Sequence, residues 1–195
     1  MAWIPGRNDS LAAVFILASF ILFIKFLQRK TWSFFTGHLF CFSLAVFTKE
    51  TAVFLALMLI LYLCLIYKKK VSLNTKSVFI FSWSIILLIW FLLRHSALEN
   101  PIKYSIPDIF KTLLSNSPAV LLYLGKVIFP VNLSVLPILP DSNVIYGFLS
   151  LFLILFFLFL SKTKRLNFIL YGVIWFLNFL FPSFIRPNPK IIADF

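Results

Sequence analysis

A short charged hinge, Thr48-Lys49-Glu50-Thr51, lies between two long apolar stretches, Trp32–Phe47 and Ala52–Tyr67. A lysine side chain at such a hinge carries a positive charge that can bind a phosphate group. Two apolar stretches joined by so short a link are expected to be antiparallel neighbours, with Lys49 and Glu50 held at one membrane surface. The alternative is a solvated loop without a ligand, because a turn requires only polar residues.

Arg7 is the second cation that could bind a phosphate, because its guanidinium can donate two parallel hydrogen bonds to phosphate oxygens. It lies in the segment Met1–Ser10, where Pro5-Gly6 predicts a turn ahead of the first helix. Further candidates are expected on the same side of the membrane: Asp9, Glu50, Arg94, His95 and Arg186. For the cations among them, anchoring at the lipid headgroups is the alternative to binding a lipid phosphate.

Several kinds of catalytic site are missing from the sequence. It contains no nucleophile–base pair, no glycine-rich phosphate loop and no metal-ligand spacing, so we expect no metal and leave the catalytic residues unassigned. Cys41 and Cys64 fall inside apolar stretches, and we expect them to be small core residues instead of a disulfide. His38 lies in the middle of an apolar stretch, so we expect it to bond to a neighbouring helix, with a proton relay as the alternative.

Composition places the chain among helical membrane proteins. Of its 195 residues, 62% are hydrophobic and 26 are Phe, and the mean hydropathy is +1.01, far above that of a soluble domain. Continuous apolar stretches of roughly 17–20 residues can each nearly cross a hydrocarbon core of about 30 Å. Because these stretches do not alternate with polar residues, a membrane barrel is excluded. The net charge of +12 comes from bases scattered at the ends of the stretches, so we expect no nucleic-acid partner.

We expect an all-α membrane protein with six spanning helices in a single polytopic domain over residues 1–195. The expected spans are Leu11–Leu27, Trp32–Phe47, Ala52–Tyr67, Ser77–Leu93, Val144–Leu160 and Leu166–Phe181. Residues 94–143 are richer in charge and proline, and we expect them to form a loop region on the outer face. Within it, Pro118–Phe129 is apolar but too short to cross, which predicts an interfacial or re-entrant helix.

Clusters of basic residues set the expected orientation. Ten of the 18 Lys and Arg residues form three clusters without acidic neighbours: Lys25, Arg29 and Lys30; Lys68–Lys70 and Lys76; Lys162, Lys164 and Arg165. Such clusters beside short loops mark the cytoplasmic side, which puts Arg7 and Lys49 on the outer side. A signal anchor over Met1–Phe23 would invert this topology. We expect instead a chain cut from a longer one, whose missing spans set the orientation.

Two sequence motifs and a looser third resemble those of a known family. The stretch Ala2–Leu11 contains Trp-Ile-Pro-Gly-Arg-Asn-Asp, and Phe47–Ala52 contains Thr-Lys-Glu. Both resemble the transmembrane and tetratricopeptide-repeat O-mannosyltransferases and their bacterial relatives, in which a "W-I-x-G-R-x-D" stretch opens a span and an "S/T-K-E" turn follows the next one. The stretch from Ser117 to Ser134 is similar to an outer-loop region of that family, where a helix ends in a "P-x-N-L-S" run.

The resemblance implies part of a GT-C-type helical bundle, the fold of polytopic glycosyltransferases that use polyprenyl-phosphate sugars. Such enzymes bind a dolichyl- or undecaprenyl-phosphate sugar and transfer the sugar, mannose for example, to a protein or glycan acceptor. The counterpart of Lys49 is expected to hold the lipid phosphate, and that of Arg7 to assist there or to position the catalytic loop. The lipid-linked sugar is the donor substrate, and no separate cofactor is implied.

The resemblance also implies a location and a limit to activity. The expected location is the bacterial inner membrane or the endoplasmic reticulum membrane, where membrane lipids, the lipid-linked sugar and the acceptor are the partners. The family's general base is an acidic residue in the first outer loop, which we expect upstream of Met1. We therefore expect this chain to be an inactive fragment of an enzyme. Asp9 matches an acid of the first motif, but it is not expected to be the base.

Two other function classes remain open alternatives. A membrane transporter or lipid flippase usually has duplicated halves and helices broken at the midplane, and no internal repeat is visible in this sequence. A non-catalytic membrane subunit would need no catalytic acid at all.

Overall fold

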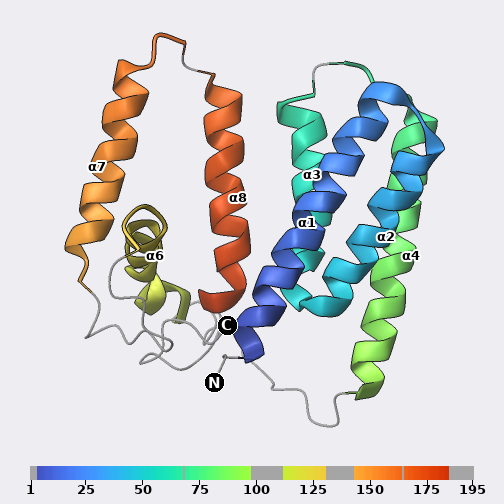
Figure 1. Ribbon diagram of the computed structural model, residues 1–195, viewed down its shortest axis with the longest axis horizontal. Coiled ribbons are helices and arrows are strands. Elements are labelled where there is room, and N and C mark those ends of the chain that lie inside the picture. Colours follow the sequence, from blue (N-terminus) through green and yellow to red (C-terminus); the bar gives the residue numbers. More distant parts are fainter. Residues whose placement is uncertain (1–3, 68, 98–111, 131–142, 164, 185–195) are drawn as a thin grey trace. The chain divides into compact units, whose positions relative to one another are not determined.

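The computed structural model describes residues 4–67, 69–97, 112–130, 143–163 and 165–184. These residues are helical apart from short connections, and none of them forms a strand (Figure 1). The predicted all-α fold class is therefore confirmed for this part of the chain. Contacts divide the chain into two compact units, Met1–Ile102 and Lys103–Phe195. The expectation of one domain over residues 1–195 stays a prediction.

The first unit is a set of antiparallel helices (Figure 1). Its elements are α1 (Ile4–Arg29), α2 (Trp32–Thr48), the 3-10 helix η1 (Glu50–Val53), α3 (Phe54–Leu65) and α4 (Leu73–Ala97). Because successive helices run in opposite directions, the start of α1 lies at the same end of the unit as the ends of α2 and α4. We call this the Lys49 end, and we call the opposite end, where α1 joins α2 and α3 joins α4, the Lys30 end.

Aromatic side chains form the core of this unit. Phe23 on α1 and Phe79 on α4 are almost completely buried, and their ring centroids lie 5.0 Å apart in an edge-to-face arrangement. Phe42 on α2 is fully buried as well. The buried residues of α1 recur every three or four positions, which is the spacing that gives a helix one inward face. They are Ala12, Ile16, Ser19, Phe23, Phe26 and Leu27.

A buried hydrogen-bond network links three helices inside this core. Nε1–H of Trp83 on α4 donates a 2.9 Å bond to Nε2 of His38 on α2. The other ring nitrogen, Nδ1, lies 3.0 Å from the backbone oxygen of Ser19 on α1, and the Ser19 hydroxyl donates to the His38 carbonyl over 3.2 Å. The expectation that His38 bonds to a neighbouring helix is confirmed. No buried side-chain N or O atom among the described residues lacks a partner.

Many large apolar side chains lie on the outward faces of the helices. On α4, Phe79 and Trp83 are buried, whereas Phe81 is 69% exposed and Phe91 is 57% exposed. Among the described helices, α1 from Arg7 to Arg29 and α4 are long and apolar enough to cross a membrane. The other apolar helical stretches, Leu166–Pro182 of α8 among them, have 10–17 residues, so the six-span arrangement stays a prediction. Two such helices with apolar outer faces are typical of a membrane protein.

The second unit contains a helical stretch over residues 112–116, followed by α6 (Ala119–Ile128), α7 (Ile145–Leu160) and α8 (Leu166–Phe184). Its buried cluster consists of Ala119, Leu122, Leu180 and Phe184. The side-chain amide of buried Asn116 donates a 3.2 Å hydrogen bond to the backbone oxygen of Phe184. This bond satisfies a carbonyl in the last turn of α8, which has no partner inside the helix.

Helices α6 and α7 cross with their backbones in contact at two glycines. A Cβ atom placed on Gly125 would lie 2.8 Å from the backbone nitrogen of Gly147, and one placed on Gly147 would lie 2.7 Å from the carbonyl carbon of Leu121. Real Cβ atoms do not approach other atoms this closely. Glycine is therefore required at both positions for this crossing.

Several predicted helix boundaries differ from the observed ones. The turn predicted at Pro5-Gly6 is wrong, because α1 already begins at Ile4. Proline suits the first helical turn, where its missing N–H has no partner to lose. The predicted span Ser77–Leu93 is too short, because α4 runs from Leu73 to Ala97. The short helix predicted over Pro118–Phe129 is observed as α6, and its position relative to a membrane stays a prediction.

Candidate functional site

The predicted hinge is a single non-helical residue. Lys49 has an extended backbone with φ −150° and ψ 133° between α2 and η1. Its N–H donates to the Ala45 carbonyl over 3.0 Å, and its own carbonyl accepts from the Ala52 N–H over 3.0 Å. Both Ala45 and Ala52 are fully buried. The backbone of Lys49 is therefore fixed on both sides by helices whose adjoining residues are packed in the core.

Lys49 and Asp9 form an ion pair at the Lys49 end of the first unit. Asp9 lies near the start of α1, one turn of helix from the core residue Ala12. The Lys49 side chain is 22% exposed and that of Asp9 is 28% exposed, so solvent screens the pair only in part. The structure thus joins the two sequence motifs, which lie 40 residues apart, through one charge pair.

Glu50 and Arg94 form a second ion pair at the same end. Arg94 lies in the last turn of α4, and its guanidinium carbon lies 5.4 Å from the centre of the Trp90 ring. An arginine over the face of a tryptophan is held by a cation–π interaction. Neighbouring residues of the hinge therefore reach in two directions, Lys49 toward α1 and Glu50 toward α4.

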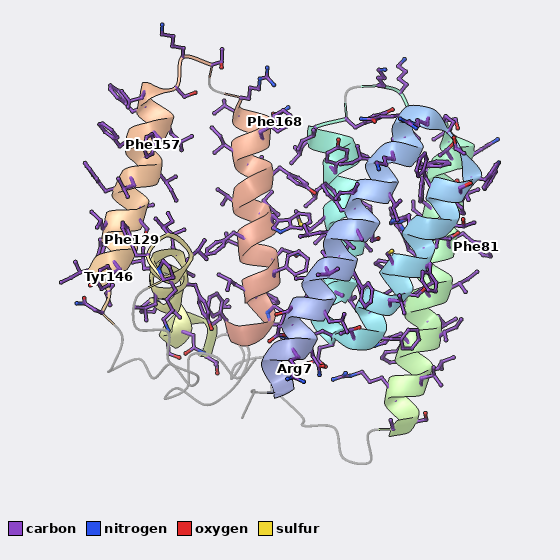
Figure 2. The ribbon with its side chains drawn as sticks, viewed as in Figure 1. Arg7, Phe81, Phe129, Tyr146, Phe157 and Phe168 are labelled. Atoms are coloured by element: carbon purple, nitrogen blue, oxygen red, sulfur yellow. The ribbon has the colours of Figure 1, made fainter. Side chains whose placement is uncertain are left out.

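The remaining candidates have different surroundings. Arg7 is exposed on the first turns of α1, at the Lys49 end (Figure 2). His95 is exposed on α4 and its ring lies 6.2 Å from that of Phe91. Arg186 lies outside the described residues. The structure therefore brings Lys49, Asp9, Glu50 and Arg94 together in pairs, and it places Arg7 and His95 at the same end.

Charge at the Lys49 end is largely balanced among the described residues. Two of the three strong bases, Lys49 and Arg94, pair with the two acids, Asp9 and Glu50. The Arg7 guanidinium is the surplus positive charge. Sequence patterning predicted cations at this end but not their pairing with acids. An incoming anion would therefore meet Arg7 first and would have to compete with a carboxylate for Lys49 or Arg94.

Sequence reasoning missed that the Trp90 ring lies against the Arg94 guanidinium. The spacing of Trp90 and Arg94 by four residues on one helix puts their side chains side by side, and this spacing could have identified the pair. Among the residues the structure describes, no three His, Cys, Asp or Glu side chains gather as ligands for a metal ion. The Arg and Lys side chains at this end are groups that can bind an anion.

Comparisons with known proteins found no relatives: no family model matches the sequence, no curated protein is similar to it, and no solved structure matches the fold.

Proposed function

We propose that the chain is part of an integral-membrane glycosyltransferase that takes a sugar from a polyprenyl-phosphate donor, with Lys49 as a ligand of the lipid phosphate. The observation that carries the proposal is the position of Lys49, whose backbone is fixed between two helices and whose side chain pairs with an acid of the other motif. The resemblance to the O-mannosyltransferase family supports the same assignment for Lys49 and Arg7.

The proposed reaction needs cations where charge develops. The bond between the sugar C1 and a phosphate oxygen breaks, and that oxygen keeps the electron pair. The acceptor hydroxyl oxygen forms the new bond to C1 and gives its proton to a general base. The phosphate leaves with one more negative charge than it had in the donor. A lysine ammonium and an arginine guanidinium near that oxygen stabilise this charge more strongly in the transition state than in the bound donor.

Asp9 is the partner of Lys49 in the structure. Without a ligand, the ammonium of Lys49 pairs with the Asp9 carboxylate, so a charge near the membrane is not left without a partner. A lipid phosphate carries negative charge as the carboxylate does, and it takes the place of Asp9 or shares Lys49 with it. Exposed Arg7 attracts the phosphate to this end before the exchange.

The proposal includes a topology. Six helices cross the membrane, the clusters at the Lys30 end and around Lys162 face the cytosol, and the Lys49 end faces outward. The location is the bacterial inner membrane or the endoplasmic reticulum membrane. A cysteine placed at residue 50 in a chain without Cys41 and Cys64 tests this arrangement. A membrane-impermeant maleimide applied to intact cells or sealed vesicles should label it from the outer side, and labelling from the cytosolic side alone would contradict the topology.

Binding of undecaprenyl phosphate to the purified chain in detergent tests the role of Lys49. Removing a charged hydrogen-bond partner of the phosphate should cost about 1.5–3 kcal/mol, which weakens binding by about ten- to a hundredfold. Lys49→Ala should show this loss, and Lys49→Arg should keep most of the affinity. Lys69→Ala at the Lys30 end is the matched control, because Lys69 is also an exposed lysine at the end of a helical segment. Equal affinity of Lys49→Ala and the unchanged chain would end the proposed role.

A further inference from the structure

A cavity opens near the Lys30 end of the first unit, away from the candidate phosphate site. Its volume is about 210 Å³ and its lining comes from α1, α2 and α4. The floor consists of Phe26, Phe35 and Phe79, which are buried and whose ring centroids lie 5.2–5.6 Å from one another. The floor of the cavity therefore suits an apolar chain.

The rim of the cavity differs from its floor. Trp32 is 67% exposed and Val78 is 41% exposed, and Asn74 and Thr75 supply polar atoms on the α4 side. An exposed tryptophan beside polar side chains is typical of the level at which lipid headgroups lie. The volume is below the range of about 300–1,000 Å³ that is common for pockets of whole small molecules. It therefore suits a segment of a longer molecule.

A lysine lies at the edge of this cavity, and two further cations are its neighbours in sequence or on α4. Nζ of Lys30 lies 5.6 Å from the centre of the Phe26 ring that forms part of the floor, so a positive charge stands at the edge of the cavity. Lys76 follows Thr75 on α4 and is exposed, as is Arg29 at the end of α1. Both acidic residues that the structure describes in this unit, Asp9 and Glu50, lie at the opposite end of the unit. No described carboxylate competes for Lys30.

We propose that this cavity binds an anionic phospholipid, with part of one acyl chain on the floor of Phe26, Phe35 and Phe79 and the phosphate at Lys30 and Lys76. The aromatic floor selects an apolar chain, and the unopposed cations select a negative headgroup over a zwitterionic one. The site requires that the chain lies in a bilayer. It is independent of sugar transfer and of Lys49.

Native mass spectrometry of the purified full chain tests the charge selection. The probes are phosphatidylglycerol and phosphatidylcholine with identical acyl chains, added at equal concentration. We expect preferential retention of phosphatidylglycerol. Lys30→Gln should reduce its retention about fivefold, the effect of one basic residue near an anionic lipid surface. Lys162→Gln, which removes an exposed lysine from the second unit, should leave retention unchanged. Equal retention of the two lipids would overturn the proposal.

Filling the cavity tests its apolar part. Val78→Trp places a large ring at the rim, whereas Ile80→Trp places the same ring on α4 at an exposed position that does not line the cavity. We expect the first variant to lose phosphatidylglycerol and the second to keep it. A phosphatidylglycerol with a photoreactive group on its acyl chain should crosslink to residues 74–79 in the unchanged chain. Retention that survives Val78→Trp, or crosslinks that miss these residues, would show that the lipid binds elsewhere on the surface.

Discussion

The indole of Trp83 and the imidazole of His38 meet through a 2.9 Å hydrogen bond in which Nε1–H donates and Nε2 accepts. An Nε2 that accepts cannot carry a proton, so the proton of the neutral ring is on Nδ1, which faces the Ser19 carbonyl at 3.0 Å. Every polar atom of the ring is satisfied, and α1, α2 and α4 are fixed in a common register. This arrangement indicates a structural histidine instead of a proton relay.

Loss of the Trp83 donor should destabilise the first unit. Trp83→Phe removes the hydrogen bond and leaves Nε2 of His38 without a partner, which should lower the free energy of unfolding by about 0.6–2 kcal/mol. Thermal unfolding of the detergent-solubilised chain measures the change. Trp90→Phe on the same helix is the control, because a ring face remains beneath Arg94. An equal effect of the two substitutions would show that the hydrogen bond to His38 does not contribute to the free energy of unfolding.

The tautomer of His38 can be observed directly. We expect the 15N spectrum of histidine-labelled protein to show a protonated Nδ1 and an unprotonated Nε2 for this residue, because Trp83 occupies Nε2 as a donor. In Trp83→Phe the 15N chemical shifts of the two ring nitrogens should move toward the averaged values of an imidazole that exchanges between its two tautomers. A protonated Nε2 in the unchanged chain would contradict the network.

Asp9 should limit the affinity of the phosphate site. Asp9→Asn removes the carboxylate that pairs with Lys49, and we expect it to strengthen binding of undecaprenyl phosphate several-fold. The pair is partly exposed, so its loss should change the free energy of unfolding by only about 0.2–1 kcal/mol. Binding and thermal unfolding of the same variant separate the two effects. Weaker binding by Asp9→Asn would mean that Asp9 supports the ligand instead of competing with it.

The Lys49 and Asp9 substitutions should also be coupled. In Lys49→Ala the carboxylate has no ammonium to compete for, so adding Asp9→Asn should have a much smaller effect on binding than it has alone. A double-mutant cycle on the dissociation constant measures this coupling. Additive changes in the binding free energy would show that Lys49 and Asp9 act on ligand binding independently.

The glycine crossing of the second unit gives a stability prediction. Gly147→Ala forces a Cβ against the backbone of Leu121, and the resulting separation of α6 and α7 should cost about 1–3 kcal/mol. Gly172→Ala on α8 is the matched control, because a Cβ there would meet nothing within 4 Å. That substitution should be neutral or stabilise the helix by up to about 1 kcal/mol. Unfolding of the two variants in the same detergent separates these outcomes.

The bounds of a helix could be predicted from the hydropathy of the sequence where the whole helix is apolar. The prediction Trp32–Phe47 matches α2, and Val144–Leu160 matches α7. Prediction from hydropathy is less accurate where a helix continues into polar residues, as α4 does at Asn74 and Arg94. A helix needs only its backbone hydrogen bonds to continue, and hydropathy does not report on them.

The candidate site was predictable to the level of which residues share an end. Antiparallel helices joined by short links place Arg7, Lys49 and Arg94 at one end of the first unit, where the structure has the start of α1 and the ends of α2 and α4. The partners of these cations were not predictable. Asp9 and Glu50 could each have paired with any of the three, and the choice depends on how α1 and α4 are rotated about their axes. That rotation is set by the buried aromatic side chains and not by local sequence.

The single-residue link at Lys49 has a mechanical consequence. One extended residue separates α2 from η1, and its backbone N–H and carbonyl are both hydrogen-bonded to the adjoining helices. We therefore expect α2 and α3 to move together when the first unit rearranges.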